Sequence, residues 1–328
     1  MGIDISVIVP AYNCQETIKN CLDSILNQTI ENRIEIVVVN DGSTDGTAQI
    51  LSEYKDNHPD SLNVITQVNS GPAKARNNGI LSASGKYIGF VDADDYIEPD
   101  MYELMLSRMA DNTDLVVCGR YNIYEDVTKV YNSYGKFDGK AVDNTPALLS
   151  KISTYVWDKL FRKDVITDNC IMFPEDCHYA EDYYFLQSYI LCGGRLAVVE
   201  KPLYHYVLAN NNSVTGKCDQ KWFDICKVLT RINEECISEG CFEQYRQELL
   251  LSAVGFYCRR IRTFKNYNNI VIPIRFVWRF IKYFNTFFEE DWKEVVFNHP
   301  IKAARQSRTS FVLMVKYIVK LRINNRNR

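Results

Sequence analysis

Short apolar runs alternate with segments of helical periodicity through the first hundred residues, and this alternation constrains the fold more than any other feature. The runs are rich in β-branched residues and nearly continuous, which is typical of strands buried on both faces of a parallel sheet. We predict strands at 5–10, 34–39, 62–66 and 86–91, and helix starts at Asn13 with Glu16, at Thr44, at Pro72 and at Pro99. Elements in this order predict an α/β fold with a doubly wound, mostly parallel sheet.

The remainder of the chain is less regular. With 328 residues, 46% of them apolar, the chain is long enough for two domains or for one large domain with an extension. We predict a strand at 115–118, a hairpin at 121–134, a helix at 180–192 and a mostly helical pattern after Gly216. The 11 cysteines are scattered through the chain without a CxxC pair, so we interpret them as reduced residues, most of them in the core.

Polar residues gather directly after three of the predicted strands. They are Pro10-Ala11-Tyr12-Asn13, residues 40–45 (NDGSTD) and the run Asp92-Ala93-Asp94-Asp95. Because ligands bind at the carboxyl ends of the strands in such sheets, these clusters predict a ligand site. Arg76, near the start of the helix before the last strand, is placed to meet a diphosphate there.

Asp92 and Asp94 lie two residues apart, so in an extended loop their carboxylates point the same way and offer hard oxygen ligands to Mg²⁺ or Mn²⁺. The alternative is a solvated turn, since a DxD triplet is expected about once by chance in a chain of this size. The strand-end position favours a metal that accompanies a phosphorylated ligand. No GxGxxG follows the first strand and no GxxxxGK[ST] occurs, which argues against dinucleotide-binding and P-loop sites.

The strand ends and the loops after them carry four ordered motifs: VIVPAYN (7–13), VVNDGSTDGT (38–47), NSGPAKARNNGI (69–80) and GKYIGFVDADD (85–95). Together they resemble the inverting family 2 glycosyltransferases with the GT-A fold. WDKLF (157–161), Glu181-Asp182, LYHY (203–206) and Asn212-Ser213 are similar to the branch of bacterial capsule, exopolysaccharide and O-antigen synthesis. The resemblance implies a GT-A domain at 1–215, with a nucleotide-sugar-binding half at 1–100 and an acceptor half at 101–215.

The resemblance also implies a UDP-sugar donor and a role for each strand-end residue. Tyr12 packs against the nucleobase, and Asp41 accepts the uracil imide hydrogen. The nucleotide site is completed by Pro10, Ala11, Asn13, Arg76, Asp92 and Ala93, and the divalent metal is held by Asp94 with Asp92. The residues alone leave alternatives: Tyr12 as a loop aromatic, Asp41 as a helix cap near Thr44, and Asp95 as an exposed turn residue.

Transfer with inversion is a single displacement that needs one base, which takes the proton of the acceptor hydroxyl. Glu181 and Asp182 begin a predicted helix, where adjacent residues diverge by about 100°, so one of them is expected to reach the acceptor. The resemblance selects Asp182. The alternative is that both acids only favour the helix N-terminus.

Three further residues of the acceptor half are candidates. His205 is a candidate metal ligand or diphosphate contact, and its alternative role is structural. Val207 stands where related sequences often carry Arg, so the diphosphate contacts of this segment differ from the family pattern. Tyr155 and Trp157 are candidates for a sugar platform, and the alternative is that they belong to the core.

The charge is divided unevenly along the chain. Residues 255–328 carry 16 basic and 4 acidic side chains, a net +12, whereas residues 1–254 carry 22 and 37, a net −15. We interpret 216–328 as a helical, basic C-terminal extension. Within it, 270–288 predicts an amphipathic helix with a basic stripe, Arg275, Arg279 and Lys282, among the aromatic residues Phe276, Trp278, Phe280 and Phe284.

This helix and a second apolar stretch at 311–321 predict attachment to an anionic membrane surface. The alternative is a helix packed on the catalytic domain. No N-terminal signal and no uncharged apolar run of membrane-spanning length occurs, so the expected location is cytoplasmic, at the inner face of the cell membrane. No zinc, RRM or helix-turn-helix motif is present, so no nucleic-acid partner is expected.

The predicted function is metal-assisted transfer of a sugar from a UDP-sugar to a glycan or a polyprenyl-diphosphate-linked acceptor, in cell-surface polysaccharide biosynthesis. Two alternatives stay open. A sugar nucleotidyltransferase would release pyrophosphate instead of UDP, although the Gly-rich loop expected after its first strand is absent. A catalytically inactive, transferase-like scaffold is the other, and the intact aspartates argue against it.

Overall fold

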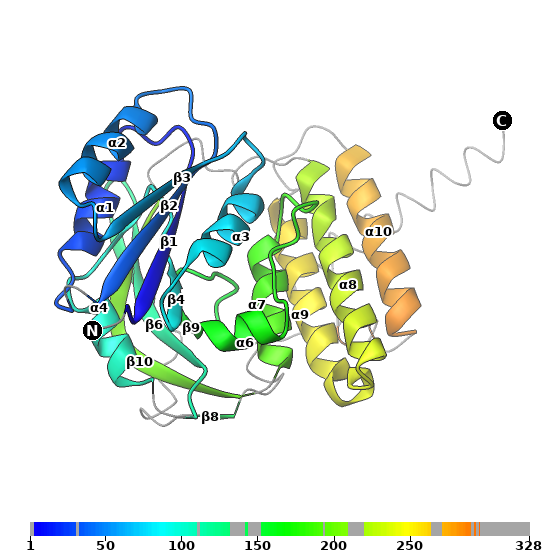
Figure 1. Ribbon diagram of the computed structural model, residues 1–328. Helices are drawn as coiled ribbons and strands as arrows, with labels where there is room; N and C mark the ends of the chain where they lie inside the picture. Colours follow the sequence, from blue (N-terminus) through cyan, green and yellow to red (C-terminus); the bar gives the residue numbers. More distant parts are fainter. Residues whose placement is uncertain are drawn as a thin grey trace. The chain divides into compact units, whose positions relative to one another are not determined.

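The computed structural model describes residues 3–30, 33–109, 112–131, 142–143, 152–192, 194–208, 220–263 and 271–289, together with 292 and 295. The chain divides into two compact units, Met1–Lys217 and Cys218–Arg328. The first unit contains one sheet with helices, and the second is helical in its described part (Figure 1).

Strands and helices alternate in the N-terminal part of the first unit, as predicted. β1 (Ile5–Ala11), β2 (Ile34–Asn40), β3 (Leu62–Thr66) and β4 (Tyr87–Phe90) pair in parallel in the order β3-β2-β1-β4. They are connected by α1 (Ile18–Leu26), α2 (Thr47–Asn57) and α3 (Pro72–Ser82) (Figure 1). The four predicted strands are confirmed to within one residue at each end. All four carboxyl ends therefore lie at one edge of the sheet.

Three of the four predicted helix starts are wrong by a few residues. α1 begins at Ile18, α2 at Thr47 and α4 (Met101–Ser107) at Met101, whereas α3 begins at the predicted Pro72. Asn13 does not cap α1, because its Oδ1 accepts the N–H of Thr44 at 2.8 Å. These polar side chains tie the loop after β1 to the loop after β2.

The rest of the sheet is mixed. β9 (Lys159–Arg162) runs antiparallel between β4 and β6 (Leu115–Ile123), and β10 (Arg195–Val207) runs parallel to β6. Antiparallel partners are β5 (Tyr96–Ile97) and β8 (Val142–Asp143) on β10, and β7 (Thr128–Tyr131) on β6. The predicted hairpin is confirmed as far as Tyr131, and its last residues lie outside the described ones. α6 (Lys163–Asp168) follows β9, and α7 (Glu181–Leu191) confirms the predicted helix at 180–192.

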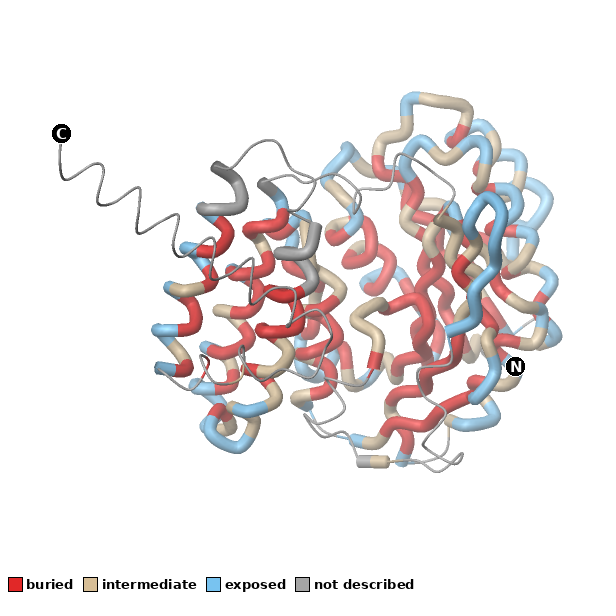
Figure 2. The backbone as a smooth tube through the Cα atoms, turned by 180° about the vertical axis from the view of Figure 1, so that it is seen from behind, coloured by how far each residue is buried: buried red, intermediate tan, exposed pale blue. Residues whose placement is uncertain are grey.

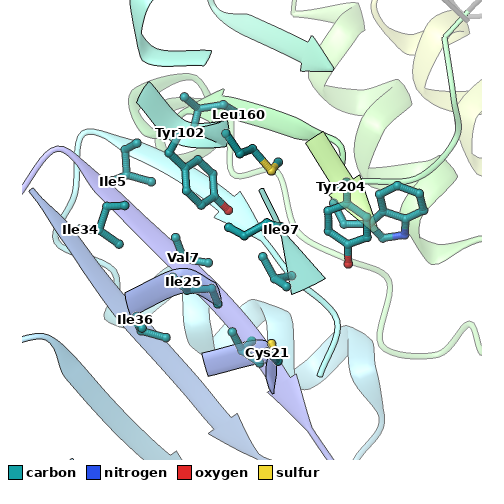
Figure 3. Close-up of a cluster of buried hydrophobic side chains, with 14 of the residues drawn as sticks. Ile5, Val7, Cys21, Ile25, Ile34, Ile36, Ile97, Tyr102, Leu160 and Tyr204 are labelled. Atoms are coloured by element: carbon teal, nitrogen blue, oxygen red, sulfur yellow. The ribbon is translucent and has the colours of Figure 1, made fainter. Parts of the chain in front are cut away.

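Both faces of the sheet are covered, which explains the continuous apolar runs. In β1, Ile5, Val7 and Val9 join a core with side chains of α1 and α4, whereas Ile8 joins a second core with side chains of α3 and α7. Figure 3 shows the first core, where Ile25 and Cys21 lie over the strand side chains. On the other face, a Cβ at Gly79 would lie 2.4 Å from Cγ2 of Ile8, so α3 lies very close to the sheet.

The second unit contains a 3-10 turn (Gln220–Phe223) and three long helices, α8 (Asp224–Ser238), α9 (Phe242–Thr263) and α10 (Val271–Phe287). α10 confirms the amphipathic helix predicted at 270–288. Its Phe276, Phe280 and Phe284 are buried, and Phe280 lies 5.2 Å from Tyr257 of α9 between ring centroids. These phenylalanines therefore belong to the core of the helical unit and are not available to a membrane, and the predicted membrane attachment of the helix stays a prediction.

The solvent face of α10 carries the basic residues. Arg275, Arg279 and Lys282 are exposed, and Trp278 between them is 55% exposed. Exposed and buried stretches alternate along the helices in Figure 2. No helix in the described part of the chain has the length and hydropathy of a membrane span. The stretch at 311–321 lies outside the described residues.

Candidate active site

The loops after β1 and β2, where the nucleotide is expected to bind, are hydrogen-bonded to each other. The carbonyl of Ala11 accepts the N–H of Asp41 at 2.8 Å, and the N–H of Asn13 donates to Ser43 Oγ at 3.1 Å. Ala11 is buried and Pro10 before it is half-buried. Tyr12 is 50% exposed, so its ring is available to a ligand at this edge.

Asp41 is buried and both of its carboxylate oxygens accept hydrogen bonds, while its predicted contact with the uracil imide stays a prediction. Oδ1 accepts the N–H of Ser70 at 2.8 Å and the side-chain amide of Gln67 at 2.7 Å, and Oδ2 accepts the N–H of Gly71 at 2.8 Å. The alternative role as a cap of α2 is wrong, because α2 follows Gly46 and none of these donors belongs to it. Asp41 fixes the loop that leads into α3.

The aspartate run follows the end of β4. Asp92 is half-buried and Asp94 is exposed, whereas Ala93 between them is buried. Desolvation by the surrounding loop, and then the charge of Asp92, raise the pKa of Asp94 to about 6. The charge of Asp92 is therefore felt by the carboxyl group of Asp94.

Asp95 has a structural role. It is 1% exposed, its Oδ2 accepts the hydroxyl of Tyr204 at 2.7 Å, and its Oδ1 accepts the N–H of Val207 at 2.8 Å. Tyr204 Oη also accepts the N–H of Asp92 at 3.1 Å. The alternative of an exposed turn residue is wrong, because Asp95 anchors the loop at 92–95 to β10.

Arg76 joins the aspartate run to the predicted base. Nη2 donates to Asp92 Oδ1 at 2.9 Å, and Nη1 donates to Asp182 Oδ1 at 3.1 Å and lies 3.5 Å from Glu181 Oε1. Its side chain is only 6% exposed. The close packing of α3 on β1 holds Arg76 at this position. Its predicted contact with a diphosphate stays a prediction.

Asp182 is the second residue of α7, after Ala180 in the left-handed region with φ 68°. Burial raises the pKa of Asp182 to about 7; the charge of Arg76 opposes this shift, and those of Glu181 and Asp92 add to it. A carboxylate with this pKa is suited to accept a proton near neutral pH. Sequence reasoning missed the bridge by Arg76, because α3 and α7 are about a hundred residues apart.

His205 lies on β10, and its contacts there are with two tyrosines and a glutamate. Its ring stacks on Tyr96 and Tyr121, with centroids at 4.2 and 4.6 Å, and its Nε2 lies 2.7 Å from Glu98 Oε1. These contacts do not include the aspartates of the loop after β4. Its role as a metal ligand stays a prediction.

Asp92 and Asp94 are the residues that fit a divalent metal. Among the described residues, no group of three or more His, Cys, Asp and Glu side chains is arranged to hold a metal ion. Two neighbouring carboxylates fit an ion such as Mg²⁺ or Mn²⁺ that completes its shell with phosphate oxygens and water.

Comparisons with known proteins identify the family of the chain. The model of glycosyl transferase family 2 matches residues 6–172. The putative glycosyltransferase EpsH of Bacillus subtilis is 35% identical over 254 residues, which cover 75% of this chain and 72% of EpsH. Chondroitin synthase of Pasteurella multocida is 31% identical over 251 residues, or 74% of this chain and 24% of that protein.

Solved structures are similar over most of the chain. A crystal structure of Staphylococcus aureus TarS 1–349 has a TM-score of 0.69 at 26% identity, covering 86% of this chain and 81% of TarS 1–349. The same protein in complex with UDP-GlcNAc has a TM-score of 0.71 at 22% identity, covering 87% and 82%. The chain therefore belongs to glycosyl transferase family 2 and has the GT-A fold with a helical C-terminal part.

Proposed function

We propose that this family 2 enzyme transfers a sugar from a UDP-sugar, with inversion, to a hydroxyl of a glycan or of a polyprenyl-diphosphate-linked glycan. The observation that carries the proposal is the contact of one guanidinium, that of Arg76, with both Asp92 and Asp182. The two nitrogens at the end of the Arg76 side chain thus contact the proposed metal-binding loop, through Asp92, and the candidate base, Asp182. The UDP-GlcNAc complex of TarS supports the donor class, and the likeness to chondroitin synthase supports a polysaccharide product.

The residues divide the chemistry as follows. The exposed ring of Tyr12 packs on the nucleobase of the donor, next to the loop that Asp41 holds in place. Asp92 and Asp94 would hold the divalent cation, whose charge offsets that of the departing diphosphate. Asp182 takes the proton of the acceptor hydroxyl as the new bond forms, and the adjacent Arg76 favours its ionised form.

A panel of nucleotide sugars tests the proposal. The protein is incubated with each sugar and Mn²⁺, with and without EDTA, and the released product is identified. Metal-dependent release of UDP is expected, and Asp182→Asn should abolish most of it. Release of pyrophosphate from UTP and a sugar phosphate would establish the nucleotidyltransferase alternative. Binding of UDP without any turnover would establish the inactive scaffold.

A second proposal concerns the location of the enzyme and rests on the exposed face of α10. We propose that the protein works at the cytoplasmic face of the membrane and that the exposed face of α10 contacts anionic lipid. Arg275, Trp278, Arg279 and Lys282 recur at i, i+3, i+4 and i+7, so they share one face of the helix. Basic residues with an exposed tryptophan suit the lipid headgroup region. A lipid-linked acceptor would be presented at the same surface.

A further inference from the structure

A stack of three aromatic rings begins at the metal-binding loop. Its inner ring is Tyr204, which is buried and hydrogen-bonded to Asp92 and Asp95. Trp157 stacks on Tyr204 with centroids 4.2 Å apart, and Tyr155 stacks on Trp157 at 4.7 Å. Trp157 is 2% exposed, whereas Tyr155 is half-buried. The stack therefore runs from the core to a ring at its outer end.

The two other neighbours of the stack lie beside it. The guanidinium carbon of Arg120 is 5.2 Å from the Tyr155 centroid and 5.5 Å from the Trp157 centroid. The ring of Tyr206 is 5.8 and 5.2 Å from the same two centroids. A group at nearly equal distances from the centroids of two stacked rings lies at the side of the stack, between the planes of the two rings. Neither Arg120 nor Tyr206 therefore lies over the outer face of Tyr155.

A buried ion pair fixes the backbone of Tyr155. Lys159 Nζ donates to the carbonyl of Tyr155 at 2.6 Å, to Asp158 Oδ1 at 2.5 Å and to Ser153 Oγ at 2.8 Å. The side chains of Lys159 and Asp158 are 0% and 1% exposed. Burying such a pair gains little net stability, so stability alone does not explain it. Its effect is to hold the loop at 153–158 in one conformation.

Both tyrosines at the outer part of the stack are in a charged surrounding. Burial raises the pKa of the Tyr155 hydroxyl; the charge of Arg120 opposes the rise, and those of Asp158, Tyr179 and Asp182 add to it. Burial likewise raises the pKa of Tyr206, with added shifts from Asp95, Asp92 and Asp94. The contacts place the stack beside the aspartate run: Tyr204 is bonded to Asp92 and Asp95, and Trp157 and then Tyr155 follow it outward.

We propose that the outer face of Tyr155 is a platform for a pyranose ring at the transfer site, held in place by Lys159. A pyranose presents an apolar face of C–H groups and a rim of hydroxyls. A rigid aromatic ring can pack on the C–H face, and the guanidinium of Arg120 beside the stack can donate hydrogen bonds to the hydroxyls. Trp157 supports the platform from below and does not itself contact sugar. This inference rests on the proposed glycosyl transfer.

The experiment uses the full chain with Tyr155→Ala, Tyr155→Phe and Lys159→Met, and with Tyr54→Ala as a control at another half-buried tyrosine, in α2. Affinities for UDP and for the UDP-sugar that the wild type hydrolyses are measured by calorimetry with Mn²⁺. KM and kcat are measured with octyl glycosides as acceptors. Thermal melts show that each variant is folded, and Tyr155→Leu replaces Tyr155→Ala if the alanine variant is not.

UDP affinity should stay unchanged in every variant. Tyr155→Ala should weaken sugar binding by about tenfold, and Tyr155→Phe should behave as the wild type. A loss confined to the UDP-sugar assigns the platform to the donor ring, and a rise in the KM for octyl glycosides assigns it to the acceptor ring. Lys159→Met should show the same selective loss of sugar binding, because Lys159 holds the backbone of Tyr155.

Two results would overturn the platform. One is wild-type affinity and KM in Tyr155→Ala, and the other is an equal loss in Tyr155→Phe, which would assign the effect to the hydroxyl. Failure of the wild type to bind UDP would instead refute the proposed function. The two failures are therefore distinguishable.

Discussion

Replacing Arg76 with glutamine should move the pH dependence of sugar transfer to higher pH. Burial raises the pKa of Asp182 to about 7, and the positive charge of Arg76 limits that rise. A neighbouring arginine lowers a carboxyl pKa by about 1–3 units, so its loss should raise the pKa of Asp182 to about 8–10. The ionised fraction at pH 7 would then fall from about one half to between about 0.1 and about 0.001. The rate should fall by about 5- to 500-fold with it.

The assay is kcat/KM for UDP-sugar hydrolysis between about pH 6 and about pH 9.5. The wild-type rate should decline below about pH 7, as Asp182 becomes protonated. Arg76→Gln should regain rate as the pH rises through the shifted pKa of Asp182. Arg76→Lys keeps the positive charge, so the midpoint of its pH dependence should lie between those of the wild type and Arg76→Gln. A uniformly lower rate with an unchanged midpoint would refute this reasoning, because the pH dependence would then be independent of Arg76.

The same variant should be less stable. Removing one partner from a buried ion pair costs about 3–5 kcal/mol, which corresponds to a fall in Tm of about 6–20 °C for a domain of this size. The folded-state pKa of Asp182 lies above its unfolded value, so stability is lost as the pH rises from the unfolded to the folded pKa, and the loss of Arg76 extends this range to higher pH. The deficit in Tm should therefore be largest in alkaline buffer and should shrink towards pH 6.

Three further predictions concern the metal, the base and the membrane. Asp94→Ala should abolish the Mn²⁺-dependent part of UDP affinity in calorimetry while leaving Tm nearly unchanged, because the side chain is exposed. Asp182→Asn should keep UDP-sugar affinity but lower kcat by about 100-fold or more, as expected for the loss of a general base. The combined variant Arg275→Glu, Trp278→Ala, Lys282→Glu should leave anionic liposomes in flotation assays while UDP binding is retained.

Each of these has a control and a contrary result. Asp60→Ala removes another exposed aspartate and should leave metal-dependent affinity intact, whereas an unchanged affinity in Asp94→Ala would remove Asp94 from the site. Turnover within a few-fold of wild type in Asp182→Asn would assign the base to another residue. Lys227→Glu reverses an exposed charge on α8 and should not release the protein. Equal release by both charge variants would mean that lipid binding depends on net charge alone.

The sequence predicted the parallel half of the sheet well, because each strand there is apolar on both faces and is bounded by polar loops. Helix starts were predicted less well, because Asn13 and Thr44 bond to each other across two loops. A capping pattern in the sequence does not show whether a side chain has a partner thirty residues away. The antiparallel strand β9 was missed, because its place between β4 and β6 depends on long-range pairing.

In the site, residue types were predictable and their connections were not. The carboxylates at the strand ends follow from the parallel topology. The bridge by Arg76 and the anchoring of Asp95 by Tyr204 join segments about a hundred residues apart, which spacing in the sequence does not show. Amphipathic periodicity correctly predicted α10, but it did not say that the helical unit itself covers the apolar face. The burial of Phe276, Phe280 and Phe284 shows that the apolar face of α10 packs within the helical unit.

The anomeric configuration of the released sugar tests the central claim most directly. An α-linked UDP-sugar is hydrolysed by the wild-type protein with Mn²⁺, and the first sugar product is followed by ¹H NMR before mutarotation. A single displacement, in which Asp182 serves as the one base, predicts that the β-anomer forms first. Initial formation of the α-anomer would contradict the inverting mechanism and the role assigned to Asp182.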